Sequence, residues 1–399
     1  VSTESTLYES TEAPYVINLS VKNLTIASGA TINLSTTGYG ANLGPGRAVT
    51  AAAADTGAGH GGIGGIGAGG DGGTVYDNIL APTQPGSGGD VGTSGAGVVF
   101  LNVSDTLTIN GIIDLAAEKS SAGGGSGGSV YINASNFTGS GLILADGGGS
   151  VNNNDGAGGG GIIAVYYGTN TFTGIFNATG GRSATNLHGG GAGTIYTKTW
   201  NQREGELTYQ NGNSTTAALS ILNSTTFSGI TLGNLTIANG SRVNANIPLT
   251  VNNTNFVLDA ISEFNPYNDF WALRITNITI SGNIQFANNY SFSPSATMTL
   301  YNGANLSHIP NSNATGVTAL YSINLSLQNI TIANGAKIDV VRGGYSSKNG
   351  PGGVSTSSGT SNPGAAYGGI GGGIATTPLQ KHTYGNLTAP LSPGSGGDG

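Results

Sequence analysis

Short glycine-containing motifs are the first places where this chain could do chemistry. Gly124 to Gly128 reads GGSGG, which matches the G-x-S-x-G pattern around a serine nucleophile, and His188 to Gly191 reads HGGG, a pattern of oxyanion holes. Gly62 to Gly67 satisfies the G-x-G-x-x-G pattern of dinucleotide sites. The first and third patterns require a helix directly after them, and no helix-forming stretch follows either. The sequence therefore predicts neither a hydrolase triad at Ser126 nor a phosphate-binding loop.

Paired carboxylates are the second chemistry to consider, because enzymes that cleave polysaccharides place two of them on one face of a site. Glu204 and Glu206 lie beside an arginine, and Asp146 and Asp155 lie in stretches rich in glycine and asparagine. The remaining acidic residues are dispersed along the chain. This pattern indicates a solvated charge cluster, so we expect no enzymatic activity. A polysaccharide-degrading enzyme is the third and weakest functional hypothesis.

Calcium is the one cofactor for which the sequence offers candidates. Asp71, Asp90 and Asp398 lie among glycines, and carboxylate and carbonyl oxygens are suitable calcium ligands. The nonapeptide repeat GGxGxDxUx is absent, and the pattern at Asp90 and its repeat Asp398 favours an Asx turn over a calcium ligand. His60 is replaced by Tyr367 in a repeat described below, which argues against a required metal ligand there. We therefore expect no cofactor, with calcium as the alternative.

Asparagine-linked glycosylation is the modification that the sequence favours. The chain contains 19 Asn-x-Ser/Thr sequons, the acceptor pattern of exported proteins. None has an acidic residue two positions before the asparagine, so archaeal or eukaryotic export is favoured over the bacterial acidic sequon. The sequon asparagines are Asn18, Asn23, Asn33, Asn102, Asn133, Asn136, Asn177, Asn213, Asn223, Asn234, Asn239, Asn252, Asn277, Asn289, Asn305, Asn313, Asn324, Asn329 and Asn386.

The most aromatic stretch runs from Phe264 to Trp271 and includes Tyr267 and Phe270. Aromatic rings can stack on sugars, but this density is more typical of a core or of a contact between subunits. We therefore predict packing here, with carbohydrate binding as the alternative.

The elements that would position such residues are strands. Four glycine clusters each run directly into an apolar stretch rich in Val, Ile and Tyr, as strands are. Glycine lets neighbouring backbones approach closely, and the apolar stretch fills a core. The four segments are TSGAGVVFLNV from Thr93, GGGSGGSVYINA from Gly123, GAGGGGIIAVYYG from Gly156 and HGGGAGTIYTKT from His188.

A second local unit consists of a strand, a tight glycine turn and another strand. It occurs at Leu24, Leu107, Leu235, Ile278 and Ile330. The Asn-Gly pairs Asn110-Gly111, Asn239-Gly240 and Asn334-Gly335 predict positive φ in these turns. Such a unit is either a β-hairpin with a type I′ turn or a corner of a parallel β-helix. Its repetition along the chain favours the corner.

The chain also repeats itself over a long distance. Asn23 to Ala48 matches Asn329 to Val354, with Thr25, Ile26, Gly29, Ile32 and other residues recurring 306 positions later. Tandem self-similarity is typical of stacked, extended architectures, and we predict a piece of a longer tandem array. The predicted organisation is a polar N-terminal arm at 1–14, a glycine-rich β-helix section at 15–200, an Asn-, Thr- and aromatic-rich β section at 201–320, and at 321–399 the start of a second copy that matches 15–90.

Composition narrows the class of protein. Apolar residues make up 37% of the chain and charged residues 8%, and the net charge is −7. That apolar content can bury a core, so disorder is disfavoured. The 12 Lys and Arg form no basic patch, so nucleic acid is an unexpected partner. Cysteine is absent, which excludes disulfides, and no apolar run is long enough to span a membrane.

The progression GGSVYINA, LILADGG, GGGGIIAVYYG and GGAGTIY resembles glycine-rich surface proteins of microbes that are predicted to form right-handed parallel β-helices. Such proteins include large exported adhesins. The resemblance covers roughly residues 91–199 and the glycine-rich blocks near Gly57 and Gly350. It implies an exported, elongated and non-enzymatic scaffold, and it supplies no catalytic residues.

The sequence thus predicts an all-β fold, a parallel β-helix or stacked β-solenoid with glycine-rich loops, and as an alternative a sandwich-like section in the middle. The predicted function is structural: a glycosylated subunit of an extracellular filament or surface layer that assembles with itself end to end. The alternative is a cell-surface adhesin that binds glycans or a neighbouring surface.

Overall fold

The structure is a computed structural model, and its described part is all-β with long parallel sheets. The described residues are 6–7, 16–47, 55–67, 69–90, 93–184, 188–212, 214, 218–227, 231–247, 249–251, 255–266, 270–272, 277–286, 290–292, 294–308, 322–323, 325–353, 365–369, 371, 383–388 and 392–396. Within these ranges no helix is long and apolar enough to cross a membrane.

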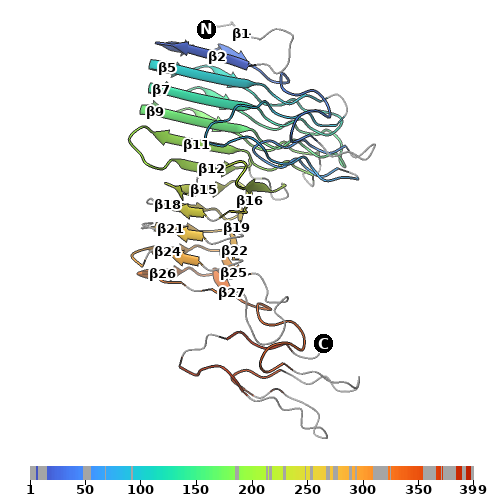
Figure 1. The fold of residues 1–399 in the computed structure, drawn as a ribbon, viewed down its shortest axis with the longest axis vertical. Coiled ribbons are helices and arrows are strands. Elements are labelled where there is room, and N and C mark those ends of the chain that lie inside the picture. Colours follow the sequence, from blue (N-terminus) through green and yellow to red (C-terminus); the bar gives the residue numbers. More distant parts are fainter. Residues whose placement is uncertain are drawn as a thin grey trace.

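The largest sheet has 12 strands and runs along the whole strand stack, from β2 to β26 (Figure 1). In spatial order it contains β2 (Val16–Val21), β5 (Val98–Ile109), β7 (Ser129–Gly139), β9 (Ile162–Phe172), β11 (Thr194–Thr199), β12 (Glu206–Gln210), β15 (Leu235–Ala238), β18 (Asn255–Leu258), β21 (Asn277–Ile280), β24 (Thr297–Leu300) and β26 (Asn329–Ile332), and β3 (Leu24–Ile26) joins it by pairing with β5.

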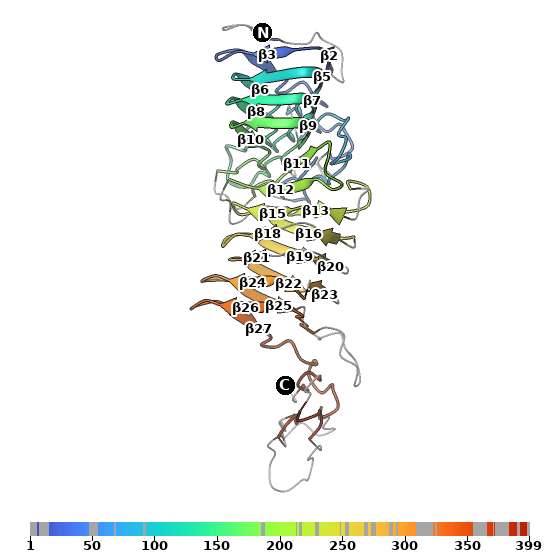
Figure 2. The same cartoon turned by 90° about the vertical axis from the view of Figure 1, so that its left-hand side faces the viewer.

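Three smaller sheets lie beside it (Figure 2). The first contains β1 (Thr6–Leu7), β4 (Thr31–Asn33), β6 (Ile112–Asp114), β8 (Leu142–Leu144) and β10 (Ile175–Asn177). The second contains β13 (Ser220–Leu222), β16 (Arg242–Ala245), β19 (Glu263–Pro266), β22 (Asn283–Phe286), β25 (Asn305–His308) and β27 (Lys337–Asp339). The third contains β14 (Thr231–Leu232), β17 (Leu249–Val251), β20 (Phe270–Ala272) and β23 (Tyr290–Phe292).

The chain visits these sheets in rotation. From β15 to β25 it passes in turn through the 12-, the 6- and the 4-stranded sheet, and each strand pairs in parallel with the strand of the previous round. We call one such round a rung. Among the described strands only β11 and β12 pair antiparallel. The sandwich-like alternative for 201–320 is therefore wrong for the described residues, because their strands form successive parallel rungs.

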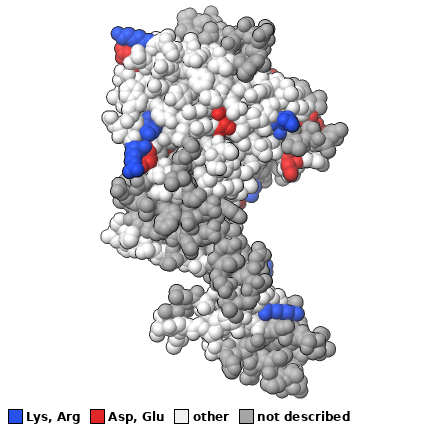
Figure 3. All heavy atoms as spheres, in the orientation of Figure 1, with Lys and Arg blue, Asp and Glu red and all other residues white. Residues whose placement is uncertain are grey.

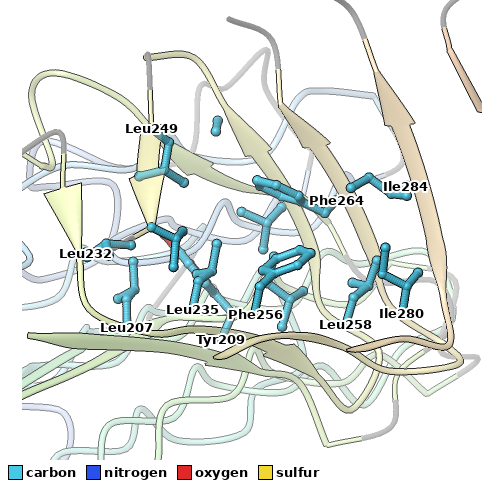
Figure 4. Close-up of a cluster of buried hydrophobic side chains, with 14 of the residues drawn as sticks. Leu207, Tyr209, Leu232, Leu235, Leu249, Phe256, Leu258, Phe264, Ile280 and Ile284 are labelled. Carbon is cyan, nitrogen blue, oxygen red and sulfur yellow. The ribbon is translucent and has the colours of Figure 1, made fainter. Parts of the chain in front are cut away.

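Alternation along each strand builds the core. Leu235, Phe256 and Ile278 lie in one register row of neighbouring strands, and all three are buried. The intervening residues, such as Val257, point outward and are partly exposed, as the period of a strand requires. Figure 4 shows the inward side chains of several strands meeting in one cluster. A second cluster fills the rungs from β2 to β10. Stacked rows of this kind make a core that continues from rung to rung.

The Gly turns are corners between sheets, not hairpins. Before the turn at Asn239-Gly240 lies β15 of the 12-stranded sheet, and after it lies β16 of another sheet. Both turn residues have positive φ, 56° and 80°, as predicted. The prediction is wrong for Asn110-Gly111, which has no positive φ. Glycine is needed there because a Cβ at Gly111 would lie 2.2 Å from the carbonyl oxygen of Ala30.

The glycine clusters before the strands form a hydrogen-bonded bundle of extended segments. The segment 156–161 shows its order. The amides of residues 156 and 159 donate to the backbone carbonyls of residues 55 and 58. The amides of residues 157 and 160 donate to the carbonyls of residues 188 and 191. The amides of residues 158 and 161 donate to the carbonyls of residues 148 and 145. Three successive amides thus donate to three different neighbouring segments. The same segment accepts again from the amide three residues further along. That is the period of a polyproline II-type helix, which has no internal hydrogen bonds.

Glycine is required in this bundle by close approach. A Cβ at Gly158 would lie 1.8 Å from the carbonyl oxygen of Gly125, and one at Gly64 would lie 1.9 Å from that of Gly57. Neither glycine has a φ in the left-handed region. The bundle therefore packs backbone directly against backbone, and it satisfies buried amides with carbonyls of other segments.

Candidate functional site

The last described rung exposes apolar side chains that a sequence copy elsewhere in the chain buries. We call 23–47, 55–67 and 69–90 the N-terminal copy, and 329–353, 365–369, 383–388 and 392–396 the C-terminal copy. Ile332 and Ile338, on β26 and β27, are 48% and 38% exposed. Their counterparts Ile26 and Ile32 are 0% exposed. The residues are isoleucines in both copies, so the difference in their exposure comes from the strands that cover them.

In the N-terminal copy the cover is the rung formed by β5 and β6. Ile26 of β3 pairs with Ile109 of β5, and Ile32 of β4 pairs with Ile113 of β6. Within the segment 98–115, β5 and β6 lie against the N-terminal copy. In the described structure β26 pairs on one side with β24, and its other edge has no strand.

A loop residue shows the same contrast more strongly. Ile79 is 1% exposed and inserts into the core formed by residues such as Leu222 and Phe227. Its amide also donates to the carbonyl of Thr226 at 2.7 Å. The counterpart in the C-terminal copy is Leu387, which is 98% exposed. Single exposed leucines are common on protein surfaces. Leu387 differs because its counterpart in the repeat fills a core, which indicates that a side chain at this position is suited to burial.

The two copies fold alike despite this difference in cover. In both, a tyrosine hydroxyl donates to a proline carbonyl and accepts from a serine hydroxyl, and the same serine accepts from a glycine amide. The paired contacts are Tyr76–Pro85 and Tyr384–Pro393, Ser87–Tyr76 and Ser395–Tyr384, and Gly46–Ser87 and Gly352–Ser395. The C-terminal copy thus holds the shape of the N-terminal copy within its described residues.

A cavity marks where the cover is missing. It measures about 440 Å³ and its lining includes Ile338, Val340, Gly344 and Gly394. At the equivalent place in the N-terminal copy, backbone groups of the covering rung dock: Gly38 donates to Gly95, Gly86 donates to Ala96, and Leu34 accepts from Gly97.

The side chains of His60 and Asp77 in the N-terminal copy meet Ser129 of β7 in a buried cluster, which sequence reasoning missed. Asp77 Oδ2 lies 3.6 Å from His60 Nε2, and Ser129 Oγ lies 3.5 Å from the same nitrogen. The other ring nitrogen, Nδ1, lies 2.7 Å from the carbonyl oxygen of Gly127. A catalytic triad places the acid and the serine on opposite ring nitrogens. With both on one nitrogen and all three residues inside the protein, this cluster fastens the N-terminal copy to β7.

The carboxyl group of Asp77 is held ionised by its surroundings. Burial, the largest influence, acts to raise its pKa. The hydrogen bond and charge of His60 and the amides of Gln84 and Asn78 outweigh it, so the pKa lies below the ordinary value. The amide of Thr83 also donates to Oδ2 at 2.8 Å. Asp77 therefore closes its own loop.

We expect Asp77→Asn to lower the free energy of unfolding at pH 7 by about 1–3 kcal/mol, because it removes hydrogen bonds to a charged acceptor. The backbone tolerates the change, since Asp77 has a φ of 68°, which asparagine also adopts. A lowered folded pKa means that the unfolded state binds the proton more readily, so this stabilisation is lost as pH falls below about 4. Urea unfolding of both proteins at pH 7 and pH 3 checks this.

The difference between the two proteins is the quantity to compare, because other carboxylates act in the opposite sense. Burial raises the pKa of Asp146 in spite of hydrogen bonds from Thr179 and Asn177. Because its pKa is raised in the folded state, protonation of Asp146 stabilises the folded protein as the pH falls. A difference between wild type and Asp77→Asn that stays constant from pH 7 to pH 3 would contradict the assignment.

The motif residues predicted to be non-catalytic lie in the glycine bundle. Ser126 is fully buried, and its hydroxyl accepts a hydrogen bond from the amide of Ser87 at 2.8 Å. His188 Nδ1 is buried and unpartnered within the described residues. Gly62 is packed so that a Cβ would lie 2.2 Å from the carbonyl oxygen of Gly191. These contacts are those of backbone packing.

The two described calcium candidates lie in different surroundings. Asp71 is exposed, Asp90 is buried, and Asp398 lies outside the described residues. The Asp90 carboxylate accepts from the Asn42 side chain at 3.2 Å and from the amide of Asp55 at 3.1 Å. Across the described ranges, no group of three acidic or histidine side chains is arranged to hold a metal ion.

The carboxylate candidates also serve separate contacts. Glu204 pairs with Arg203 at 3.2 Å, while Glu206 accepts from the side chain of Asn234 at 3.0 Å. Asp155 accepts from the side chain of Asn152 at 2.8 Å. Figure 3 shows the consequence for this face: charged side chains are few and scattered over a largely uncharged surface.

The sequon asparagines that the structure describes all reach the surface. Asn18, Asn23, Asn102, Asn136, Asn239, Asn329 and Asn386 are exposed, and Asn33, Asn133, Asn177, Asn223, Asn234 and Asn305 are partly exposed. Asn213, Asn252, Asn289, Asn313 and Asn324 lie outside the described residues, as does the side chain of Asn277. The aromatic stretch is described only in part: Phe264 is buried against Phe256, and the side chains of Phe270 and Trp271 are outside the described set.

Comparison with protein-family models, with curated proteins and with solved structures found no match to this chain.

Proposed function

We propose that this protein is an extracellular structural subunit, a parallel β-solenoid that assembles end to end into a glycosylated filament or surface layer. The stack of parallel rungs is the observation that carries the proposal, because each rung buries the apolar side chains of its neighbour. A strand edge with apolar neighbours invites another strand, and the N-terminal copy shows that this sequence is made for burial. The chain's rotation through three sheets supports the solenoid.

The remaining features are consistent with a mechanical role. Backbone hydrogen bonds run along the full stack of rungs and through the glycine bundle, so that stability is distributed over the length of the molecule. The sparse charge of the visible face offers little electrostatic protection against non-specific association. Glycans on the exposed sequon asparagines would supply that protection. Peptide mapping by mass spectrometry of material from the source organism tests the glycans.

Negative-stain electron microscopy across a concentration series tests the assembly. We expect fibres with a fixed axial repeat, whose number rises with protein concentration. Monodisperse short rods that stay unchanged up to the highest concentration would contradict the filament. Binding of such rods to a glycan array would instead favour the adhesin.

A further inference from the structure

The sequon asparagines differ in what their side-chain nitrogen does. In four of the described ones, Nδ2 donates a hydrogen bond to a side chain of the neighbouring rung, and we call these the rung-linking sequons. Their acceptors are side-chain oxygens of Asn102 for Asn133 at 3.2 Å, Asp105 for Asn136 at 3.4 Å, Asp146 for Asn177 at 2.9 Å and Glu206 for Asn234 at 3.0 Å. Because Nδ2 is the atom that an N-linked sugar is attached to, these contacts compete with glycosylation.

A strand produces the sequon pattern without any need for a sugar. Alternate residues of a strand lie on the same face, so Asn and Ser or Thr both point outward while the residue between them points inward. The residues in the middle of three rung-linking sequons, Ala134, Phe137 and Leu235, are indeed buried. Asn133 also uses its oxygen, which accepts from the indole nitrogen of Trp200 at 3.1 Å. These asparagines thus have a structural role that accounts for their presence.

Two other sequons fold back on themselves. The hydroxyl and the amide of Ser35 donate to Asn33 Oδ1 at 2.6 and 2.9 Å. The hydroxyl and the amide of Thr225 donate to Asn223 Oδ1 at 2.5 and 3.0 Å. Each is an Asx turn closed by the hydroxyl residue of the sequon itself, and we call Asn33 and Asn223 the turn sequons. Both are partly exposed, and within the described residues neither Nδ2 donates a hydrogen bond.

Asn33 and Asn177 show what makes the difference. They lie in one register row of the five-stranded sheet, at the ends of β4 and β10. The Asp146 carboxylate accepts from Asn177 Nδ2 and also from the hydroxyl and the amide of Thr179, at 2.8 and 2.7 Å. The hydroxyl of Ser35 donates to its own asparagine instead. The place in the fold is the same, so Asp146 is what occupies the nitrogen of Asn177.

We propose that Asn33 and Asn223 accept N-linked sugars, whereas the four rung-linking sequons stay unmodified. The proposal rests on the glycosylation proposed above and names its sites. In the transfer, Nδ2 forms a bond to the anomeric carbon of a glycosyl diphosphate donor. The bond from that carbon to the phosphate oxygen breaks, the diphosphate leaves with its electron pair, and the amide loses one proton.

The turn favours this step in two ways. Hydrogen bonds donated to Oδ1 draw electron density from the amide, so Nδ2 gives up its proton more readily. The carboxamide is planar with its oxygen and nitrogen on opposite sides, so an oxygen held against the turn leaves the nitrogen on the outer side. In a rung-linking sequon the transfer must first break a hydrogen bond between rungs.

Sugar transfer to the folded chain tests the assignment. Full-length protein, produced unmodified in a host without the pathway, is incubated with an oligosaccharyltransferase and its glycosyl diphosphate donor. Mass spectrometry then gives the initial rate at each sequon. We expect Asn33 and Asn223 to react about tenfold faster than Asn177, the factor that corresponds to one hydrogen bond to a charged acceptor. In a protease digest of the same protein all nitrogens are released, and the difference should disappear.

A pair of variants isolates the cause. Asp146→Ala should raise the rate at Asn177 about tenfold, since it removes the acceptor, and should leave the rate at Asn33 unchanged. Asp114→Ala is the matched control, because Asp114 lies in the same register row and bonds to the amide of Ala116, not to a sequon. The comparison of folded protein with its digest needs no variant, so it decides the matter even if Asp146→Ala fails to fold.

The outcomes separate this assignment from glycosylation itself. Equal rates at the turn and rung-linking sequons of the folded protein would overturn the assignment and leave glycosylation intact. Sugars on Asn133, Asn136, Asn177 or Asn234 in material from the source organism would do the same. Absence of sugar from every sequon of that material would overturn both.

Discussion

Replacing Gly158 by alanine is expected to destabilise the protein by about 3 kcal/mol, the upper range for overpacking a filled interior. The added Cβ would lie 1.8 Å from the carbonyl oxygen of Gly125 and 2.5 Å from its carbonyl carbon. Both atoms are backbone, and the segments on either side are hydrogen-bonded to further segments. The clash therefore cannot be relieved by a rotating side chain, and it must separate neighbouring segments of the glycine bundle.

Urea unfolding and hydrogen exchange measure this effect. Amides that cross the bundle, such as Gly181 donating to Gly158 at 2.7 Å, should lose protection first. Gly69→Ala is the matched control, because a Cβ at Gly69 meets nothing within 4 Å and its φ is not in the left-handed region. Equal stability of the two variants would show that the bundle adapts to side chains and that its glycines are not required by contact.

Ile79→Ala is expected to cost about 2–5 kcal/mol, as truncation of a fully buried aliphatic side chain does. Ile79 is part of the core cluster that includes Leu222 and Phe227, and it is the loop residue that locks the N-terminal copy onto later rungs. The variant leaves a cavity inside this buried cluster. The surrounding core has little freedom to collapse into the cavity, so we expect the loss of stability to lie above the lower end of this range.

Leu387→Ala is the internal control for this prediction. The same type of residue stands at the same position of the repeat, but Leu387 is exposed, so its truncation should change the stability of the dilute monomer by less than about 0.5 kcal/mol. Thermal unfolding of both variants below the assembly concentration compares them. A large loss in Leu387→Ala under these conditions would mean that the C-terminal copy is already covered within a single molecule.

Much of the architecture follows from local sequence. The four glycine clusters run into β5, β7, β9 and β11 as predicted, because an apolar alternating stretch after glycine has few other ways to bury itself. The all-β class is confirmed for the same reason. The strand–turn–strand units are corners, as their repetition indicated. The predicted positive φ at Asn110-Gly111 is wrong. The backbone there is determined by the close approach of Ala30, which is distant in sequence.

The candidate sites were harder to predict from the sequence than the fold. The histidine of the Ser129 cluster was considered as a metal ligand, and its partners were missed, since Asp77 and Ser129 come from segments far from it in sequence. Comparison of the copies held one signal: His60 and Asp77 change together, to Tyr367 and Gly385. The pair Ile79 and Leu387 was equally visible in the alignment, but nothing local distinguishes a core residue in a loop from an exposed one.

The sequence by itself determined the strand content, the glycine clusters and the fact that two stretches are copies, because these are properties of short-range pattern and of identity. Only the tertiary structure decided which copy is covered. Burial depends on the strands that come to lie alongside, and in the N-terminal copy these are β5 and β6. The three-residue hydrogen-bonding period of the glycine bundle was likewise decided there, because each of its amides meets a segment that folding brings from elsewhere in the chain.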